Sequence, residues 1–201
     1  MAFGQRWVHG GLVLAVVVLS MCLTVLILGA TRKAHNNWGL PGSPATDFYL
    51  KDTRGEPTTL SENRGKTAVL IFTGHNDTGF GTYAKLVNGI LNAYRDDADV
   101  RILGIAYAHD LALFGPSETR PAVLQRLCPE LRVSADADGS VARAYRINGT
   151  PTLVVIDHEG FIRGRIPLDQ EGAAIAITEQ IQSVRQAETS VRSVVGPLPE
   201  D

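Results

Sequence analysis

The pattern of hydrophobic and polar positions is clearest between Thr67 and Leu91. Residues 68–72 (AVLIF) form a continuous apolar run, which is typical of a strand covered on both faces of a sheet. A polar, glycine-rich turn at residues 73–81 follows, and apolar side chains then recur every three or four residues as far as Tyr94. The pattern predicts a buried strand, a turn and a helix. Binding chemistry is expected at the turn, at the carboxyl end of the strand.

Shorter apolar runs separated by polar turns fill the rest of the chain. They predict strands at 47–51, 58–60, 100–107, 132–135, 151–156 and 161–166, and helices at 79–94, 117–127, 138–145 and from 169 onward. The order strand, helix, strand between Thr67 and Tyr107 implies a right-handed crossover with parallel strands. The fold class is therefore expected to be α/β, with one folded domain at residues 45–188 and a disordered tail at 189–201.

An uncharged apolar stretch lies near the amino terminus, between Gly10 and Ala30. It is long enough to cross a hydrocarbon core of roughly 30 Å as a helix. We predict a single transmembrane anchor there, preceded by residues 1–9 and followed by a polar connector at 31–44. A cleaved signal peptide is the main alternative, although its apolar region is normally shorter. Positive charges flank both ends of the stretch, so the charge pattern does not predict which side of the bilayer the domain occupies.

Charge and cysteine content narrow the classes of function. The formal net charge is −2, which does not favour a nucleic-acid surface, so we expect no nucleic-acid partner. The chain has two cysteines, and because Cys22 falls in the predicted anchor, Cys128 is the one thiol of the domain. A disulfide within the domain is therefore excluded.

Residues 141–162 (VARAYRINGTPTLVVIDHEGFI) carry the most specific motif of the chain. With Asp47-Phe48 and Gly65-Lys66, they resemble the redoxin branch of the thioredoxin-like superfamily, which holds TlpA-like membrane-anchored thiol-disulfide oxidoreductases and peroxiredoxins. The resemblance implies a thioredoxin-like fold with a central mixed sheet flanked by helices. It also implies a cis bond at Thr150-Pro151, beside which such proteins dock an extended substrate chain. An ordinary trans proline at the start of a strand is the alternative.

The expected active-site motif of this family is missing. In the family a Cys-x-x-Cys pair follows the strand at a helix amino terminus, where amide donors stabilise a thiolate. Counting from the strand places Asp77 and Phe80 at the two cysteine positions. A second registration, similar to the loop of Sco/SenC copper chaperones, places His75 and Gly79 there instead. The peroxiredoxin motif is also absent, so no residue of this turn supports thiol exchange.

Two further chemistries depend on isolated residues. Cys128 precedes a proline at a predicted helix end, and we expect it to be a small buried apolar group, with a reactive thiol as the alternative. His75 and Asp77 could approach His109 and Asp110, but without sulfur such a set would hold copper(I) poorly. We therefore expect no metal site and no cofactor.

The sequence thus favours a membrane-anchored, non-catalytic thioredoxin-like domain that binds an extended peptide or protein partner. The resemblance places the domain on the extracytoplasmic side of a membrane. The alternatives are a thiol-disulfide oxidoreductase or peroxidase that uses Cys128, and a Sco-like copper-handling protein. The expected binding residues are Thr150, Pro151, His75, Asn76, Asp77 and Phe80.

Overall fold

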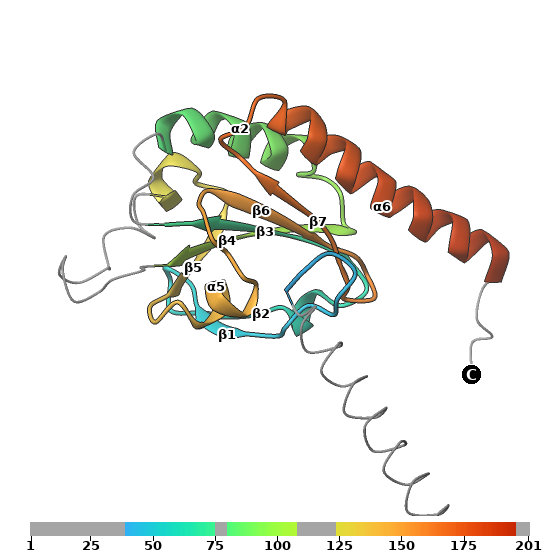
Figure 1. Ribbon diagram of the computed structural model, residues 1–201, viewed down its shortest axis with the longest axis horizontal. Coiled ribbons are helices and arrows are strands. Elements are labelled where there is room, and N and C mark those ends of the chain that lie inside the picture. The colour runs from blue at the N-terminus through green and yellow to red at the C-terminus, as the bar shows by residue number, and fades with distance from the viewer. Residues whose placement is uncertain (1–38, 75–79, 108–123, 196–201) are drawn as a thin grey trace, which may run out of the picture. The chain divides into compact units, whose positions relative to one another are not determined.

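A computed structural model describes residues 39–74, 80–107 and 124–195. A five-stranded sheet lies at the centre of the domain (Figure 1). Its strands are β3 Thr67–Thr73, β4 Val100–Tyr107, β5 Arg132–Asp136, β6 Thr152–Ile156 and β7 Ile162–Pro167. The helices are α2 Phe80–Ala93, α5 Ser140–Ala144 and α6 Ala173–Val195, with a short 3-10 helix η1 at Ser61–Asn63. A separate hairpin pairs β1 Tyr49–Lys51 with β2 Pro57–Thr59.

The sheet is mixed, with strand order β5-β4-β3-β6-β7. β3 runs parallel to β4 and antiparallel to β6, and β4 runs parallel to β5. This confirms the predicted parallel arrangement of β3 and β4. Because β6 runs the opposite way, its first residue, Thr152, lies beside Phe72 near the carboxyl end of β3. The loop before β6 therefore meets the turn after β3.

Both faces of the sheet are covered, and β3 shows why its sequence is continuously apolar. Alternate side chains point to opposite faces. Val69 and Ile71 pack in a cluster with α2 and α6, whereas Leu70 and Phe72 pack in a second cluster with α5 and the hairpin. Figure 1 shows α2 and α6 on one side of the sheet and α5 with β1 and β2 on the other. All seven residues of β3 are buried.

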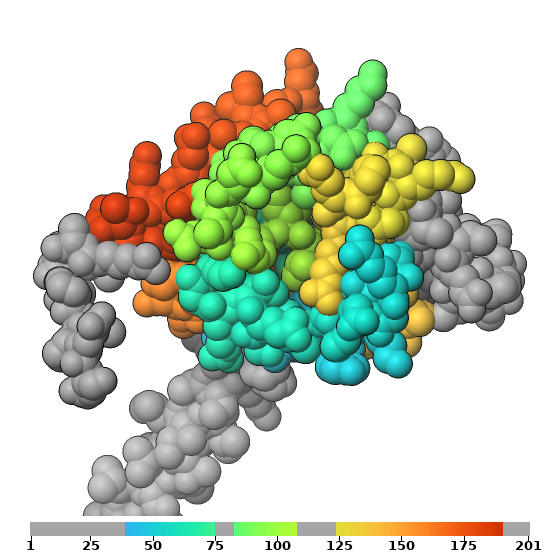
Figure 2. All heavy atoms as spheres, turned by 180° about the vertical axis from the view of Figure 1, so that it is seen from behind, coloured from blue at the N-terminus to red at the C-terminus, as the bar shows by residue number. Residues whose placement is uncertain are grey.

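The β1–β2 hairpin closes the β5 edge of the sheet. Its turn is held by a side chain: the Asp52 carboxylate accepts the amide N–H groups of Arg54 and Glu56, and Gly55 has a φ of +83°. The same carboxylate pairs with Arg132 at the start of β5, and Thr53 donates its amide to Val133. Figure 2 shows the hairpin, in cyan, against the yellow segment that leads into β5. An otherwise open strand edge is thereby paired.

Two predicted boundaries are wrong. Residues 39–44, which we assigned to the connector, belong to the domain: Gly42 donates its amide to Ile162, and Ile162 donates to Ser43. At the other end, α6 continues to Val195, although we assigned residues from 189 onward to a disordered tail. In this last part of the helix, the hydroxyl of Thr189 donates to the backbone carbonyl of Arg185, one turn earlier.

Several predictions lie outside the described residues. The anchor at 10–30 and most of the helix predicted at 117–127 are among them, although residues 124–127 are helical. Within the described ranges, no helix has the length and apolar character needed to cross a membrane.

Candidate functional site

Gly74 at the end of β3 lies against Thr150 in the loop before β6. Gly74 follows directly after β3, and a β-carbon added to it would lie 2.4 Å from Oγ1 of Thr150. That distance is far below van der Waals contact, so the two segments can approach this closely because residue 74 has no side chain. Gly74 was not among the predicted site residues, and its importance is visible only in the tertiary contact.

Thr150 and Pro151 form the cis peptide bond that the resemblance implies. The bond forms part of the wall of a cavity of about 340 Å³, whose other lining comes from residues 147–149, Thr152, the end of β7 and Asp169. The loop is held by hydrogen bonds on both sides. Thr152 donates its hydroxyl to the carbonyl of Gly149 (2.7 Å), and Leu168 donates its amide to the carbonyl of Pro151 (2.9 Å). The backbone around the cavity is therefore preorganised.

Arg165 on β7 fastens the start of this loop. Its guanidinium donates to the carbonyl groups of Gly39, Tyr145 and Arg146, the last at 2.9 Å. The planar group with its five N–H donors suits three acceptors better than a lysine would. Burial, together with the positive charge of Arg146, lowers the pKa of Arg165, which still remains a cation at neutral pH. Sequence reasoning missed Arg165, because it is one of two arginines on this strand and nothing in the sequence distinguishes it from Arg163.

Tyr145, which precedes the same loop, is held in the core. It is 1% exposed, its ring lies 5.5 Å from that of Phe72, and its hydroxyl donates to the carbonyl of Thr46 (2.7 Å). Burial raises the pKa of Tyr145, so the hydroxyl stays protonated and acts as a donor. This residue is a structural support and does not face the cavity.

Cys128 is fully buried, as predicted. Its exposure is 0%, it belongs to the cluster between the sheet and α2, and its sulfur lies 3.9 Å from the carbonyl oxygen of Ala84. Burial raises the pKa of the Cys128 thiol, because the thiolate would lose its hydration. A protonated thiol without solvent access does not attack a disulfide.

The remaining predicted site residues cannot be placed. His75, Asn76, Asp77 and Gly79 lie outside the described residues, and Phe80 is described only as the first residue of α2. No group of three or more His, Cys, Asp or Glu side chains that could hold a metal ion occurs in the described ranges. His109 and Asp110 also lie outside them.

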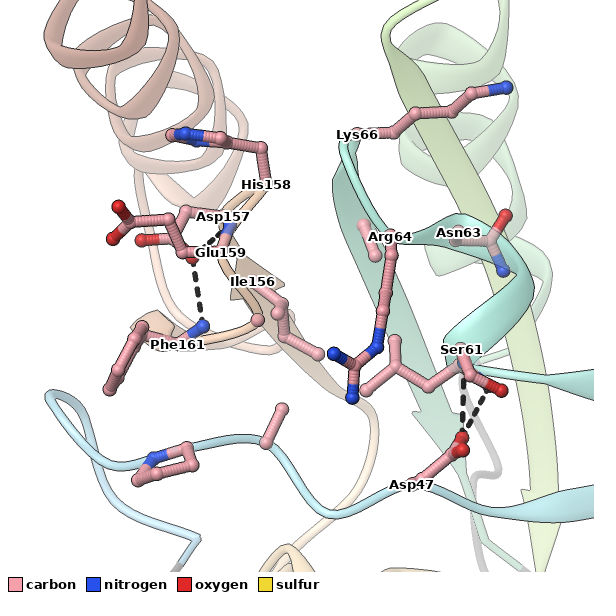
Figure 3. Close-up of a pocket in the computed structure, with 15 residues that line it drawn as sticks. Asp47, Ser61, Asn63, Arg64, Lys66, Ile156, Asp157, His158, Glu159 and Phe161 are labelled. Carbon is pink, nitrogen blue, oxygen red and sulfur yellow. Dashed lines mark hydrogen bonds between the residues drawn. The ribbon is translucent and has the colours of Figure 1, made fainter. Parts of the chain in front are cut away.

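A second, smaller cavity of about 120 Å³ lies at the opposite end of β3 and β6 (Figure 3). Its charged groups are largely engaged in holding the fold. The Asp47 carboxylate accepts amide N–H groups from Phe48, Leu60 and Ser61. The Asp157 carboxylate accepts the amide of Phe161 (2.8 Å). In α/β sheets ligands bind at the carboxyl ends of the parallel strands, so we assign the binding site to the Thr150-Pro151 end.

Solved structures similar to this chain share one fold. A proposed protein disulfide isomerase from Bacteroides thetaiotaomicron is 25% identical, with a TM-score of 0.60 over 72% of this chain and 89% of that one. A proposed thiol:disulfide interchange protein DsbE from Chlorobium tepidum is 21% identical, with a TM-score of 0.59 over 72% and 96%. A secreted disulfide oxidoreductase from Mycobacterium tuberculosis, homologous to DsbE of Escherichia coli, is 17% identical, with a TM-score of 0.54 over 68% and 95%.

A search of curated protein sequences finds no match. The likeness to the solved structures shows that the α/β fold with its mixed five-stranded sheet is thioredoxin-like. The domain is of the redoxin type found in thiol-disulfide oxidoreductases. The sequence profile of the AhpC/TSA family matches residues 41–165, which include β3 to β6 and most of β7. This chain belongs to the AhpC/TSA family.

Proposed function

We propose that this domain is a non-catalytic redoxin-family protein that binds an extended segment of a partner protein beside Thr150-Pro151. The observation that carries the proposal is the state of Cys128: the one thiol of the domain has 0% exposure and lies in the hydrophobic core. The thiol-disulfide chemistry of the family needs an accessible thiolate. What remains of the family site is its preorganised cavity and loop.

The cavity suits a backbone ligand. Its lining combines apolar surface from Ile147, Pro151 and Pro167 with the polar groups of Asn148 and Thr150, and it includes the charged residues Arg165 and Asp169. Extended peptides bind other proteins through main-chain hydrogen bonds and insert alternate side chains into neighbouring pockets. A loop that is already held by Arg165 loses little conformational entropy when a ligand binds.

We further propose that residues 10–30 anchor the protein in a membrane with the domain on the extracytoplasmic side. The support is the uncharged apolar run and the placement of relatives: the similar protein of Mycobacterium tuberculosis is described as secreted. Protease protection in spheroplasts checks the orientation. Digestion of the domain in intact spheroplasts supports it, and protection until the membrane is lysed contradicts it.

Thiol reactivity tests the loss of catalysis. The full-length Cys22→Ser variant, solubilised in a mild detergent, has Cys128 as its one thiol. We expect the native protein to react with an aromatic disulfide at least 100-fold more slowly than the same protein in denaturant. We also expect no thiol-dependent reduction of insulin or peroxide above the buffer rate. Turnover that Cys128→Ser abolishes would show that the protein is an oxidoreductase.

Peptide binding tests the site itself. Fluorescence anisotropy of labelled, unstructured hexapeptides measures affinity for the full-length protein. Thr150→Trp fills the cavity and should weaken binding about tenfold or more, whereas Thr178→Trp, a matched change on the exposed face of α6, should leave it unchanged. Equal affinities of the two variants would remove the site from the Thr150-Pro151 loop.

A further inference from the structure

A third cavity, of about 520 Å³, lies beside the proposed peptide site and has a distinct chemistry. It is formed by the end of α5, the residues that follow, and Tyr107 at the carboxyl end of β4. Its charged lining consists of Arg143 and Arg146, and no Asp or Glu is among the described residues that line it. An electropositive hollow is therefore present at the same end of the sheet as Thr150.

The charges of these two arginines are less compensated than those of several others in the domain. Arg132 pairs with the buried carboxylate of Asp52, and Arg163 pairs with that of Asp157. In the described part of the chain, no carboxylate forms an ion pair with Arg143 or Arg146.

The carboxylates of Asp138 and Asp169 do not line this hollow. Arg143 donates to the backbone carbonyl of Asp138, and hydrogen bonds from Ser140, with a smaller contribution from the charge of Arg143, lower the pKa of the Asp138 carboxyl. Asp169 lines the neighbouring peptide cavity. Arg146 has a second cation, Arg165, for a neighbour. The positive field of Arg146 and Arg165 is therefore reinforced and remains available to a ligand.

The hollow adjoins the peptide cavity, because Ile147 and Asn148 line both of them. Arg146 and Thr150 are four residues apart, so their Cα atoms lie within roughly 14 Å of each other, because each residue spans at most about 3.6 Å. A strand that rises about 3.3 Å per residue would cover this distance with four to five residues.

We propose that the bound partner segment is acidic, with Asp or Glu side chains that enter the hollow and pair with Arg143 and Arg146. This inference rests on the proposed peptide-binding function and adds the class of partner. Guanidinium groups bind carboxylates through paired, charge-assisted hydrogen bonds, and a positive hollow speeds the encounter with an acidic chain. The acidic residue is expected two to four positions from the residue that lies opposite Thr150.

Matched peptides test the charge preference. The probes are fluorescein-labelled hexapeptides of sequence TEVEVT, TQVQVT and TKVKVT, and the protein is the full-length chain in a non-ionic detergent. We expect the Glu peptide to bind about tenfold more tightly than the Gln peptide, and the Lys peptide to bind most weakly. The Glu preference should shrink as the salt concentration rises from 50 to 500 mM, because salt screens exposed charges.

Matched variants locate the preference. Arg143→Gln with Arg146→Gln should weaken the Glu peptide at least fivefold and leave the Gln peptide unchanged. The control, Arg64→Gln with Arg126→Gln, removes the same net charge elsewhere and should retain the preference. Should the double variant unfold, Arg146→Lys keeps the charge, and its Glu peptide affinity should stay within about threefold of wild type.

The outcomes separate the two proposals. Equal binding of the Glu and Gln peptides, or an equal loss of both in the Arg143 and Arg146 variant, overturns the acidic-partner inference and leaves peptide binding intact. Absence of binding by every peptide overturns the proposed function, and the acidic-partner inference with it. Binding of the Glu peptide that survives Thr150→Trp but is lost in the arginine variant would show the hollow to be a separate anion site.

Discussion

The charged side chains at the two ends of the central sheet are used in different ways. Where β3 begins and β6 ends, the carboxylates are occupied by the protein: Asp157 accepts N–H groups from Glu159, Phe161 and Arg163. Where β3 ends and β6 begins, Arg143 and Arg146 form no ion pair with a carboxylate of the described part of the chain.

The difference separates charged groups that stabilise the fold from charged groups that are available to bind a ligand. A buried charge that is fully paired stabilises one conformation and has no capacity left for a ligand. An exposed cation beside a preorganised loop contributes little to stability, so its removal should change binding alone.

The largest effect on stability is expected from Asp157→Ala. The carboxylate is 5% exposed and its removal leaves three donors without their acceptor, which should lower the free energy of unfolding by about 3 kcal/mol. Urea denaturation of the full-length protein measures the change. Glu159→Ala is the control, since its side chain is 56% exposed, and it should change stability by less than about 0.5 kcal/mol. A small loss for Asp157→Ala would mean that its hydrogen bonds contribute little.

A smaller loss is expected from Glu188→Ala, which detaches the end of α6 from the sheet. Glu188 Oε1 accepts the hydroxyl of Thr67 (3.1 Å) and the amide of His158 (3.2 Å), and it lies 3.1 Å from Nδ1 of His158. The side chain is 14% exposed, so we expect a loss of about 1–2 kcal/mol and faster amide hydrogen exchange after Glu188. Glu179→Ala, on the exposed face of the same helix, should have no such effect.

Gly74→Ala should impair binding more than stability. The added methyl group meets Oγ1 of Thr150 at 2.4 Å, so the threonine side chain must move at the wall of the peptide cavity. We expect peptide affinity to fall about fivefold, or about 1 kcal/mol, while the urea midpoint changes little. Unchanged affinity would separate the end of β3 from the binding site. Gly89→Ala, which has open space around its β-carbon, serves as the control.

The smallest expected effect is on the pH dependence of stability in acid, to which Asp47 and Asp136 should contribute with opposite sign. Burial alone would raise the pKa of Asp47, but hydrogen bonds from Ser61, Phe48 and Leu60 outweigh it and hold the pKa below its usual value. Its stabilising contribution is therefore present above the unfolded-state pKa and is lost as pH falls through the lower, folded-state pKa. Asp47→Asn should make the free energy of unfolding less dependent on pH between about 2 and 5.

Asp136 should behave in the opposite sense. Burial raises the pKa of its carboxyl, despite the amide donors of Ala142 and Val141, so the folded state binds a proton more readily than the unfolded state. Its contribution to stability therefore decreases as pH rises from the unfolded-state pKa through the folded-state pKa. The pH dependence of urea midpoints for wild type, Asp47→Asn and Asp136→Asn distinguishes the two. If the difference in urea midpoint between wild type and each variant changed with pH in the same direction for both variants, this assignment would be contradicted.

Local patterns in the sequence determined most of the sheet, and the family resemblance implied the cis bond. The apolar runs at β3, β4 and β6 predicted those strands to within one residue, because a strand covered on both faces of a sheet is mostly apolar. The motif around Thr150-Pro151 pointed to the correct loop. The identity of every residue between Thr73 and Gly81 also excluded a cysteine pair.

Contacts between distant segments decided the rest. The three carbonyls bound by Arg165 come from residues 39, 145 and 146, and the approach of Gly74 to Thr150 spans 76 positions (150 − 74). No periodicity encodes such pairs, because a side chain's partner depends on which strands become neighbours. The placement of Arg143 and Arg146 in a hollow whose described lining holds no carboxylate likewise arises only once α5 has packed on the sheet.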